Sequence, residues 1–351
     1  MQHLSTPHVL VTGAAGFIGL HVCQRLLETG YRVTGLDVVS ERFAQLRRDR
    51  LAVLGIDLPE RKNARQRSTR YAELDFYRSD IRDRESMAKV FASGITHVIH
   101  LAALVGVRRS VEAPRPYQEV NVEGFFNVLE LSRQYNIAHL VFASSSSVYG
   151  LTDEIPFRVE HPVDHPASFY AATKKANELF AHSYAHLHGL PVTGLRFFTV
   201  YGPWGRPDMA PYLFTRNIVD GVPIRVFNYG KLRRDFTYVG DIAEGIARIW
   251  SVPPVPLAPD APLVPGRSRS PYRVYNIGHG APVDIMTFIQ EIEALTGHSA
   301  EIQLVEHQPG DVEETFADIA GLRADFGYAP ATSLEVGLRA YWEWFREYYA
   351  V

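Results

Sequence analysis

Tyr170 and Lys174 are the side chains whose types and spacing most directly predict acid–base chemistry in this chain. They lie in ASFYAATKKANELFAHSYAHL, a helix-like segment, so a spacing of four places the phenol and the ammonium on one helix face. A nearby positive charge favours a phenolate, and lowering a tyrosine pKa from about 10 towards 7 corresponds to ~4 kcal/mol. Such a tyrosine is a competent general base. Taken alone, the pattern is common by chance, and an ordinary pair on a surface helix explains it better.

Hydroxyl groups come before this pair, in the strand-like segment VFASSSSVYG. Serines at the end of a strand can complete a proton relay to the tyrosine. They can also simply satisfy backbone groups at the strand end. The order of the segments, with serines first and the Tyr-x-x-x-Lys pair after them, is more specific than either segment alone.

Three glycines follow the first strand-like run, VLVT. Gly13, Gly16 and Gly19 stand in GAAGFIG, directly before the helical segment LHVCQRLLETG. Glycines in this context permit a tight turn and a close approach of the backbone to a pyrophosphate at a helix N-terminus. The next strand ends in Asp37, whose carboxylate can bind ribose hydroxyls and repels a 2′-phosphate, which favours NAD over NADP. Arg42 is the basic side chain that bears on this preference. A glycine turn without a cofactor is the plainer alternative.

Strand-like and helix-like segments alternate along the chain and must position these residues. The expected strands are Val9–Thr12, Arg32–Asp37, His97–Leu101, Leu140–Ala143 and Val192–Phe198. This alternation predicts an α/β fold with a doubly wound parallel sheet of the Rossmann type. The Arg-rich segment 40–70 predicts a helix and a solvated loop, and the Pro-rich segment Ser251–Pro271 predicts a surface loop.

The composition excludes several classes of protein. With 46% hydrophobic and 21% charged residues among 351, the chain can bury a large core and is not generally disordered. A formal net charge of −3 gives no reason to expect a nucleic acid or a membrane as partner. The single cysteine, Cys23, excludes an internal disulfide framework, and no apolar run is long enough to span a bilayer. We therefore expect a cytoplasmic protein that binds a small molecule. His182 and His186 stand four apart, but without a third ligand they predict no metal site.

Together, GAAGFIG, Asp37, Asp80-Ile81, HLAA, SSSSVYG, YAATK and RFFTVYGP resemble the extended short-chain dehydrogenase/reductase superfamily, the NAD-dependent epimerases and dehydratases, over nearly the whole chain. The resemblance implies catalysis by Ser145, Tyr170 and Lys174. Ser145 is chosen because in this family the catalytic hydroxyl lies four residues before the tyrosine of the SSSSVYG motif, here Tyr149. The implied cofactor contacts are Gly13, Gly16, Phe17, Ile18, Gly19, Asp37, Asp80, Ile81, Leu101, Ala102, Ala103, Tyr170 and Lys174.

The later segments RFFTVYGPWGRPDM, VFNYGKLRRDFTYVGDIAEG and QPGDVEETFAD resemble the UDP-glucuronate 4-epimerases in particular. This resemblance implies a diphosphate contact from Arg234, a uridine ribose contact from Asp311, and Asn228 beside the uracil. Gln308 matches that branch, whereas UDP-galactose epimerases have Arg there. An ordinary surface ion pair is the alternative for Arg234.

The carboxylate of such a substrate sets a chemical requirement. Oxidation at C4 creates a β-keto acid, which loses CO2 when the carboxylate turns perpendicular to the ketone plane. Short hydroxyls and a cation can hold the carboxylate in another orientation. The residues expected to meet the substrate are Ser146, Ser147, Thr199, Arg206, Asn228, Arg234, Asp311 and Arg108. UDP-glucuronate decarboxylases carry Glu at the position of Ser147.

The resulting hypothesis is an isomerase that interconverts UDP-glucuronate and UDP-galacturonate by transient oxidation at C4, rotation of the 4-keto sugar and reduction on the opposite face. A UDP-glucuronate decarboxylase, another UDP-sugar 4-epimerase and a catalytically silent NAD-binding regulator are the alternatives. We expect an NAD-binding Rossmann domain over residues 1–190, with a segment near 235–250 returning to it. A smaller α/β domain, mainly 191–351, would bind the UDP-sugar. Relatives pair the helices around Tyr117–Tyr135 and Ser168–His188 across a homodimer, so a homodimer is expected.

Overall fold

The computed structural model describes residues 7–306 and 313–351, and its contacts divide the chain into two compact units. Unit 1 comprises Met1–Thr152, Val159–Arg196 and Ala243–Tyr275. Unit 2 comprises Asp153–Arg158, Phe197–Ile242 and Asn276–Val351. Each unit is described separately below.

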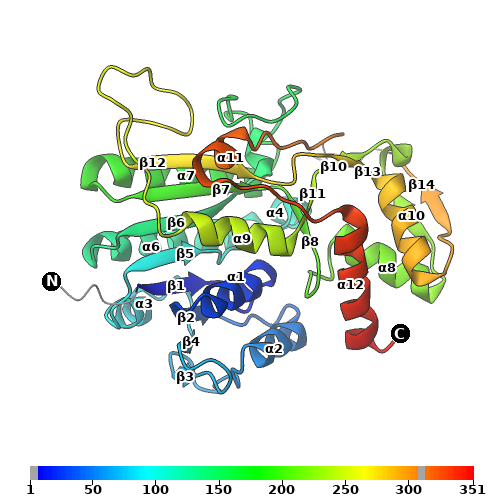
Figure 1. Ribbon diagram of the computed structural model, residues 1–351, viewed down its shortest axis with the longest axis horizontal. Helices are drawn as coiled ribbons and strands as arrows, with labels where there is room; N and C mark the ends of the chain where they lie inside the picture. The colour runs from blue at the N-terminus through cyan, green and yellow to red at the C-terminus, as the bar shows by residue number, and fades with distance from the viewer. Residues whose placement is uncertain (1–6, 307–312) are drawn as a thin grey trace. The chain divides into compact units, whose positions relative to one another are not determined.

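Eight strands form the central sheet, in the order β12-β7-β6-β5-β1-β2-β4-β3 (Figure 1). Their bounds are β1 His8–Thr12, β2 Arg32–Asp37, β3 Arg65–Arg67, β4 Leu74–Arg78, β5 His97–His100, β6 His139–Ser145, β7 Val192–Phe197 and β12 Tyr272–Ile277. The predicted strands are all present, with ends that differ by at most two residues. The pairs β1–β2, β1–β5, β2–β4 and β5–β6 are parallel, and the short β3 is antiparallel to β4.

The strand order confirms the predicted Rossmann-type fold. From β4 through β2, β1, β5 and β6 to β7, the order is the 3-2-1-4-5-6 of a doubly wound sheet. The order reverses between β1 and β5, and ligands of such sheets bind at the carboxyl ends of the strands at this point. Every residue of β1 is buried, as expected for a central strand covered on both faces.

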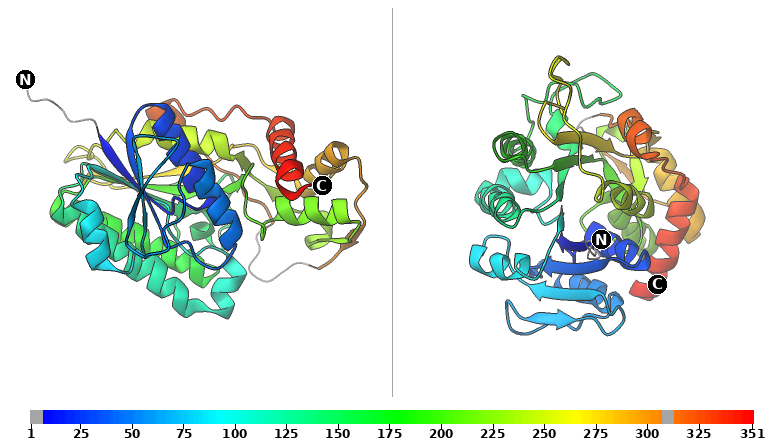
Figure 2. Two further views of the ribbon diagram at one scale, coloured as in Figure 1. Left: turned by 90° about the horizontal axis from the view of Figure 1, so that it is seen from below. Right: turned by 60° about the vertical axis from the view of Figure 1, so that its left-hand side comes forward.

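The helices are α1 Phe17–Glu28, α2 Ala44–Val53, α3 Arg84–Phe91, α4 Val107–Glu112, α5 Pro114–Tyr117, α6 Gly124–Gln134, α7 Phe169–His188, α8 Ala210–Asp220, α9 Val239–Ile249, α10 Ile285–Thr296, α11 Ala320–Phe326 and α12 Leu334–Tyr349. A π-helix, η1, spans Gln118–Glu123, and two 3-10 turns are η2 Ser146–Tyr149 and η3 Asn228–Gly230. In unit 1, α3, α6 and α7 lie on one face of the sheet and α1 on the other (Figure 2). On the α3–α6–α7 face, Phe125, Leu129, Phe142 and Ala181 belong to one buried apolar cluster.

The segment 40–70 contains the predicted helix, α2, and also the short strand β3. The Pro-rich segment Ser251–Pro271 contains no helix or named strand, as predicted. Within the described ranges, no helix combines the length and the apolar character that crossing a membrane requires.

Unit 2 has its own apolar core and three two-stranded sheets. The strands are β8 Thr199–Tyr201, β9 Ile224–Val226, β10 Arg233–Arg234, β11 Phe236–Tyr238, β13 Val283–Asp284 and β14 Ile302–Leu304, paired as β8–β11, β9–β14 and β10–β13. Phe236, Phe288, Tyr341 and Phe345 lie in the core, and the rings of Phe236 and Phe288 stack with centroids 4.2 Å apart. The aromatic C-terminal segment is therefore a packing helix, α12.

Asp235 organises the polar part of unit 2. Its side chain is fully buried, and its carboxylate accepts backbone N–H bonds from His279 at 2.7 Å, Gly280 at 2.9 Å and Ala317 at 3.0 Å. The hydroxyl of Thr237 donates a fourth bond, at 3.3 Å. One carboxylate therefore joins β10–β11 to two loops that are distant in sequence.

Replacing Asp235 by Ala is expected to lower the free energy of unfolding by about 3 kcal/mol or more, because three backbone N–H groups lose their acceptor in a buried place. Urea denaturation of the purified protein measures this change. The matched control is Asp318→Ala, whose carboxylate accepts the N–H of Ala320 at an exposed position, and the expected loss there is about 1 kcal/mol. Equal losses in the two variants would contradict the organising role of Asp235.

Candidate active site

The glycine turn lies between β1 and α1, at the carboxyl end of β1. Gly13 has φ +77°, and a Cβ there would lie 2.8 Å from the backbone N of Ala102, after β5. A Cβ on Gly16 would lie 2.8 Å from the Gly13 carbonyl oxygen, and a Cβ on Gly19 would clash with the same oxygen. All three positions thus require glycine. Gly16 is the N-cap of α1 and has no side chain to accept the first-turn N–H groups, which are the donors that a pyrophosphate needs.

Asp37, the last residue of β2, lies against this turn. Its carboxylate accepts N–H bonds from Ala15 at 3.2 Å and from Val39 at 2.7 Å, and the side chain is 5% exposed. The cation that pairs with it is Arg47, on α2, with Nη1 3.3 Å from Oδ1. Arg42, the arginine that the sequence singles out, instead lies over the ring of Phe43.

The other predicted cofactor residues lie at the ends of β4 and β5 or in the first turn of α1. The Leu101 N–H donates to the Thr12 carbonyl at 3.1 Å, and the Ala102 N–H to the Thr12 hydroxyl at 3.2 Å, so the loop that continues into Ala103 is fixed to the end of β1. Asp80 and Ile81 follow β4, and Phe17 and Ile18 lie in the first turn of α1. Ile81 and Phe17 are buried, and Ile18 is half-buried. The structure therefore gathers these residues around the point where the strand order reverses.

Asp80 is held by its neighbour Arg82, whose Nη2 lies 2.7 Å from Oδ2 and whose backbone N–H also donates to the carboxylate. Burial alone would raise the pKa of Asp80, but the hydrogen bonds and charge of Arg82 lower it overall. Asp80 is consequently a carboxylate at neutral pH.

The predicted catalytic residues lie on β6 and α7 of unit 1. Ser145 ends β6, and its hydroxyl accepts the N–H of Ser147 and donates to the Ser147 hydroxyl, both at 3.2 Å. Ser168 caps α7 by accepting the N–H of Ala171, which starts the helix just before Tyr170. Tyr170 is 9% exposed. These side chains are therefore fixed at a strand end and in a first helical turn.

Lys174 is buried, and its ammonium donates to the Ala143 carbonyl oxygen of β6 at 2.8 Å. Burial lowers the pKa of Lys174 from 10.5 to about 8. The side chain is thus still mainly charged at neutral pH, close to the pH at which it loses its proton.

Asn121 was missed by the sequence reasoning. It lies in the π-helix η1, and its amide exchanges two bonds with Leu104, accepting its N–H at 2.8 Å and donating to its carbonyl at 2.9 Å. The same amide donates to the Thr173 hydroxyl, and Asn177 donates to the Asn121 carbonyl. Asn121 therefore joins the loop after Ala103 to the helix of Tyr170 and Lys174. The segment QEVNVE has no local pattern that predicts a π-helix, so the sequence offered no signal for Asn121, although π-turns often occur at functional sites.

The predicted substrate residues of unit 1 are Ser146, Ser147 and Arg108. Both serines are half-buried in the turn η2, directly after Ser145, and Arg108 is exposed on α4. Ser147 is the one that contacts Ser145. The structure thus brings a second hydroxyl to Ser145, the predicted catalytic serine, and this four-residue turn contains no carboxylate.

The predicted substrate residues of unit 2 are Thr199, Arg206, Asn228 and Arg234. Thr199 is half-buried in β8, its N–H bonded to the Asp235 carbonyl at 3.1 Å, which places Thr199 and Arg234 on adjoining segments. Arg206 forms an ion pair with Asp208 at 2.7 Å. The Arg234 guanidinium donates to the carbonyls of Arg233 and Glu313, and the Asn228 amide donates to the Lys231 carbonyl. Asp311 and Gln308 lie outside the described residues.

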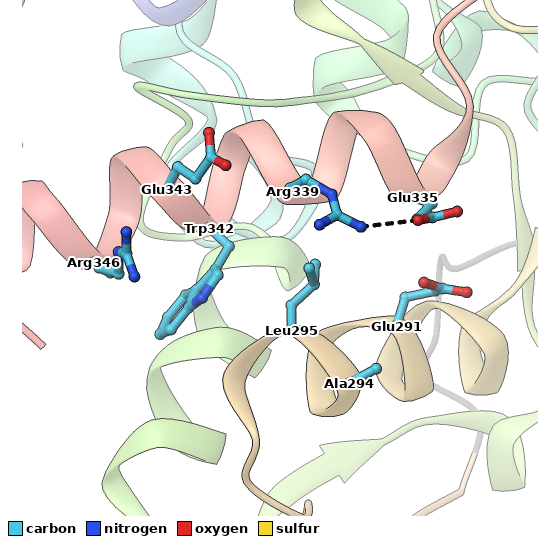
Figure 3. Close-up of a pocket in the computed structure, with 8 residues that line it drawn as sticks. All are labelled: Glu291, Ala294, Leu295, Glu335, Arg339, Trp342, Glu343 and Arg346. Atoms are coloured by element: carbon cyan, nitrogen blue, oxygen red, sulfur yellow. Dashed lines mark hydrogen bonds and ion pairs between the residues drawn. The ribbon is translucent and has the colours of Figure 1, made fainter.

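A groove of about 440 Å³ lies between α10 and α12 in unit 2 (Figure 3). Its lining residues are Glu291, Ala294, Leu295, Glu335, Arg339, Trp342, Glu343 and Arg346. None of these is a predicted site residue, and opposite charges pair within the groove, as between Arg339 and Glu335 at 2.9 Å. The groove is therefore not the candidate active site.

Comparisons with known proteins agree with this geometry. The sequence pattern of the NAD dependent epimerase/dehydratase family matches residues 9–260. The chain is 44% identical to "Protein CapI" of Staphylococcus aureus, covering 97% of this chain and 99% of that protein. It is 40% identical to a "Probable UDP-glucuronate 4-epimerase" of Rhizobium meliloti, covering 97% of both chains. A crystal structure of UDP-glucuronic acid 4-epimerase from Bacillus cereus, in complex with UDP-glucuronic acid and NAD, superposes with a TM-score of 0.82 at 31% identity, covering 97% of this chain and 100% of that one.

Replacing Lys174 by Met is expected to raise the free energy of unfolding at pH 7 by ~1–3 kcal/mol, although it removes a predicted catalytic group. Folding buries the Lys174 ammonium and lowers its pKa from 10.5 to about 8, so at pH 7 the charged side chain destabilises the folded chain. Between these pH values the unfolded chain holds the proton and the folded chain does not, so wild-type stability rises with pH across this window. The difference in free energy of unfolding between Lys174→Met and the wild type should therefore become smaller from pH 8 to pH 10.5.

Denaturant unfolding at pH 7, 9 and 10.5 measures this difference. Lys89→Met, at an exposed position of α3, is the matched control and should show no such pH dependence. A difference for Lys174→Met that stays constant over this range would contradict a buried lysine with a lowered pKa.

Proposed function

This chain belongs to the NAD dependent epimerase/dehydratase family and to the UDP-sugar 4-epimerases within it, and we propose that its substrate pair is UDP-glucuronate and UDP-galacturonate. The observation that carries the proposal is the turn at the end of β6. It presents Ser145, Ser146 and Ser147 in succession, with the Ser145 and Ser147 hydroxyls 3.2 Å apart. Such a turn can hold a reacting sugar hydroxyl and a neighbouring carboxylate at once. The full-length relatives with this activity in their names support the same substrate.

NAD, the cofactor of this family, fits the residues of unit 1. The glycine turn leaves no space for side chains where its backbone meets the loop after β5, and glycines without side chains let a pyrophosphate come close to the backbone. Asp37 ends β2, where a carboxylate binds the adenosine ribose. When bound, NAD supplies reversible oxidation of C4 of the sugar. The predicted contacts at Asp80, Ile81 and Leu101–Ala103 complete the proposed site.

Tyr170 is proposed to take the proton of the O4 hydroxyl as the C4 ketone forms, and to return it when the alcohol is restored on the other face. The Lys174 ammonium, held on the Ala143 carbonyl, stabilises the phenolate that accepts this proton. The Ser145 hydroxyl both donates and accepts hydrogen bonds, so it can relay the proton between O4 and Tyr170. Rotation of the 4-keto sugar about its link to the diphosphate presents its second face.

The carboxylate of the 4-keto intermediate must stay out of the orientation in which CO2 leaves. The proposed contacts of this carboxylate are Ser146, Ser147, Thr199 and Arg206. Because Arg206 is already paired with Asp208, it supplies directed hydrogen bonds with little net charge. Arg108, exposed on α4, is proposed as a further contact of the anionic substrate.

Arg234 is proposed to bind the diphosphate, Asp311 the uridine ribose, and Asn228 to lie by the uracil. Arg234 donates to two backbone carbonyls through one nitrogen, Nη1. A guanidinium carries its five N–H donors in a planar fork that matches the oxygens of a phosphate, which supports this role for Arg234. The position of Arg234 is set by the strand pair β10–β13 and by the buried Asp235 that follows it.

The purified protein, incubated with NAD and UDP-glucuronate, is expected to form UDP-galacturonate and no CO2. Chromatographic separation of the sugar nucleotides and trapping of released CO2 measure the two products. The variant Ser147→Glu should lower kcat/KM for formation of UDP-galacturonate about 100-fold, because it replaces a hydroxyl that is proposed to hold the carboxylate by the residue that UDP-glucuronate decarboxylases carry there. Ser251→Glu, in an exposed loop, is the control and should have wild-type activity. A UDP-pentose with CO2 would identify a decarboxylase, and turnover of UDP-glucose alone would identify another UDP-sugar 4-epimerase.

A homodimer through α6 and α7 is the proposed assembly. Large apolar side chains on these helices are exposed, namely Phe126 by 47%, Leu179 by 57%, Phe180 by 37% and Leu187 by 68%. Several large exposed apolar side chains on two helices in contact are typical of an interaction site, which supports this proposal.

Light scattering is expected to give twice the chain mass of 39.5 kDa. Leu179→Glu should shift the particle towards the monomer, because it places a charge in the proposed apolar interface. Leu263→Glu changes a side chain that is 61% exposed in the Pro-rich segment, and it should leave the dimer intact. A monomeric wild-type protein at micromolar concentration would rule out this assembly.

A further inference from the structure

A buried ion pair joins α7, which carries Tyr170 and Lys174, to β7, the strand beside β6. Glu178 and Arg196 are 3% and 2% exposed, and they form two parallel bonds, from Nε to Oε1 and from Nη2 to Oε2, both at 2.9 Å. Glu178 lies on α7, one turn after Lys174, and Arg196 lies on β7, the strand beside β6. Burial alone would lower the pKa of the Arg196 guanidinium, but the Glu178 carboxylate raises it overall. The Arg196 guanidinium therefore stays charged in this buried place.

Such a pair is poorly explained by stability alone. Removing two charges from water has a large free-energy cost, and apolar residues of similar volume often give equal or greater stability at such positions. Two parallel bonds between planar groups do, however, fix the distance and the orientation of the elements that carry them. The remaining contacts of the pair lead towards the active site.

The first of these contacts is Ser144, whose hydroxyl donates to Glu178 Oε1 at 2.6 Å. Ser144 immediately precedes Ser145, and it follows Ala143, whose carbonyl accepts the Lys174 ammonium. Adjacent residues of β6 are thus bonded to α7 at two positions one helical turn apart. These two bonds fix the position of Lys174 along β6, relative to the strand end at Ser145.

The second contact is Tyr149, whose ring centroid lies 4.8 Å from the Arg196 guanidinium carbon. Tyr149 ends the turn η2 that begins directly after Ser145. Arg196 therefore contacts the turn of the hydroxyls through Tyr149 and the helix of Tyr170 and Lys174 through Glu178. One guanidinium links both sides of the catalytic arrangement.

We propose that Glu178 and Arg196, together with Ser144 and Tyr149, are positioning residues that hold Ser145, Tyr170 and Lys174 in their reactive arrangement. They act through the catalytic side chains and do not contact the substrate. Proton transfer between groups at hydrogen-bond distance is sensitive to displacements near 1 Å, which cost roughly 100-fold in rate. This inference rests on the proposed epimerase only in assuming that these three side chains share one reaction.

The test compares Ser144→Ala with Ser132→Ala. Both remove one buried hydroxyl, but within the described residues the Ser132 hydroxyl has no hydrogen-bond partner. Ser144→Ala should lower kcat about tenfold with KM within about twofold, and Ser132→Ala should change neither. A second readout is the pH at which the Tyr170 phenolate absorbance appears in the NAD-bound enzyme, isolated by subtracting the spectrum of Tyr170→Phe. A displaced Lys174 ammonium should move this titration upward by about half a pH unit or more.

Glu178→Met combined with Arg196→Met keeps the side chains long and apolar and leaves no unpaired buried charge. This double variant is expected to keep the wild-type unfolding midpoint, to lose at least about tenfold in kcat, and to show the same upward titration. Wild-type kcat and an unshifted titration in Ser144→Ala and in the folded double variant would overturn the proposal. The variants are compared on whichever UDP-sugar the wild type turns over, and the titration needs no substrate. A failure of the UDP-glucuronate proposal is therefore distinguishable from a failure of this one.

Discussion

The interaction on which the site depends is the hydrogen bond between the buried Lys174 ammonium and the Ala143 carbonyl of β6. A charge without water is costly, and in this place one carbonyl oxygen and the shape of the surrounding core compensate only part of the cost. The pKa of Lys174 is lowered because burial costs more than these contacts compensate. A charge so placed acts strongly on a neighbouring phenol, because water does not screen it. The unfavourable burial of Lys174 thus lies where the proposed chemistry requires a strong local electric field.

The rest of unit 1 can be understood as the support for that arrangement. Parallel strands end at one edge of the sheet, so residues that are far apart in sequence arrive together at the point where the strand order reverses. The turn after β1 and the loop after β5 contact each other through Gly13 and Ala102, and the amide of Asn121 fixes that loop to α7. Unit 2 shows the same principle in Asp235, where one carboxylate fixes two loops beside Arg234.

Much of this arrangement could be predicted from the sequence, and the failures share one cause. Alternating strands, the glycine turn and the Tyr-x-x-x-Lys pair are local patterns, whose spacing alone reports on backbone geometry. Arg47, Asn121 and the Glu178–Arg196 pair depend on which side chains meet across the fold. Arg42 and Arg47 both follow Asp37 closely, and only the orientation of α2 decides that Arg47 reaches it. No spacing rule predicts the π-turn that carries Asn121.

The turn after β1 is assembled by bonds within the chain. Asp37 accepts the Ala15 N–H, the buried Arg50 donates to the Ala15 carbonyl, and Gly13 is bonded to Leu36. Because the turn is already ordered, binding of a dinucleotide carries no free-energy cost for ordering it. Slow release of the dinucleotide is the kinetic counterpart of this preorganisation, because most differences in affinity appear in the dissociation rate. In the proposed reaction the same sugar is oxidised and then reduced, so slow release would keep the reduced cofactor in place until the second half of the reaction is complete.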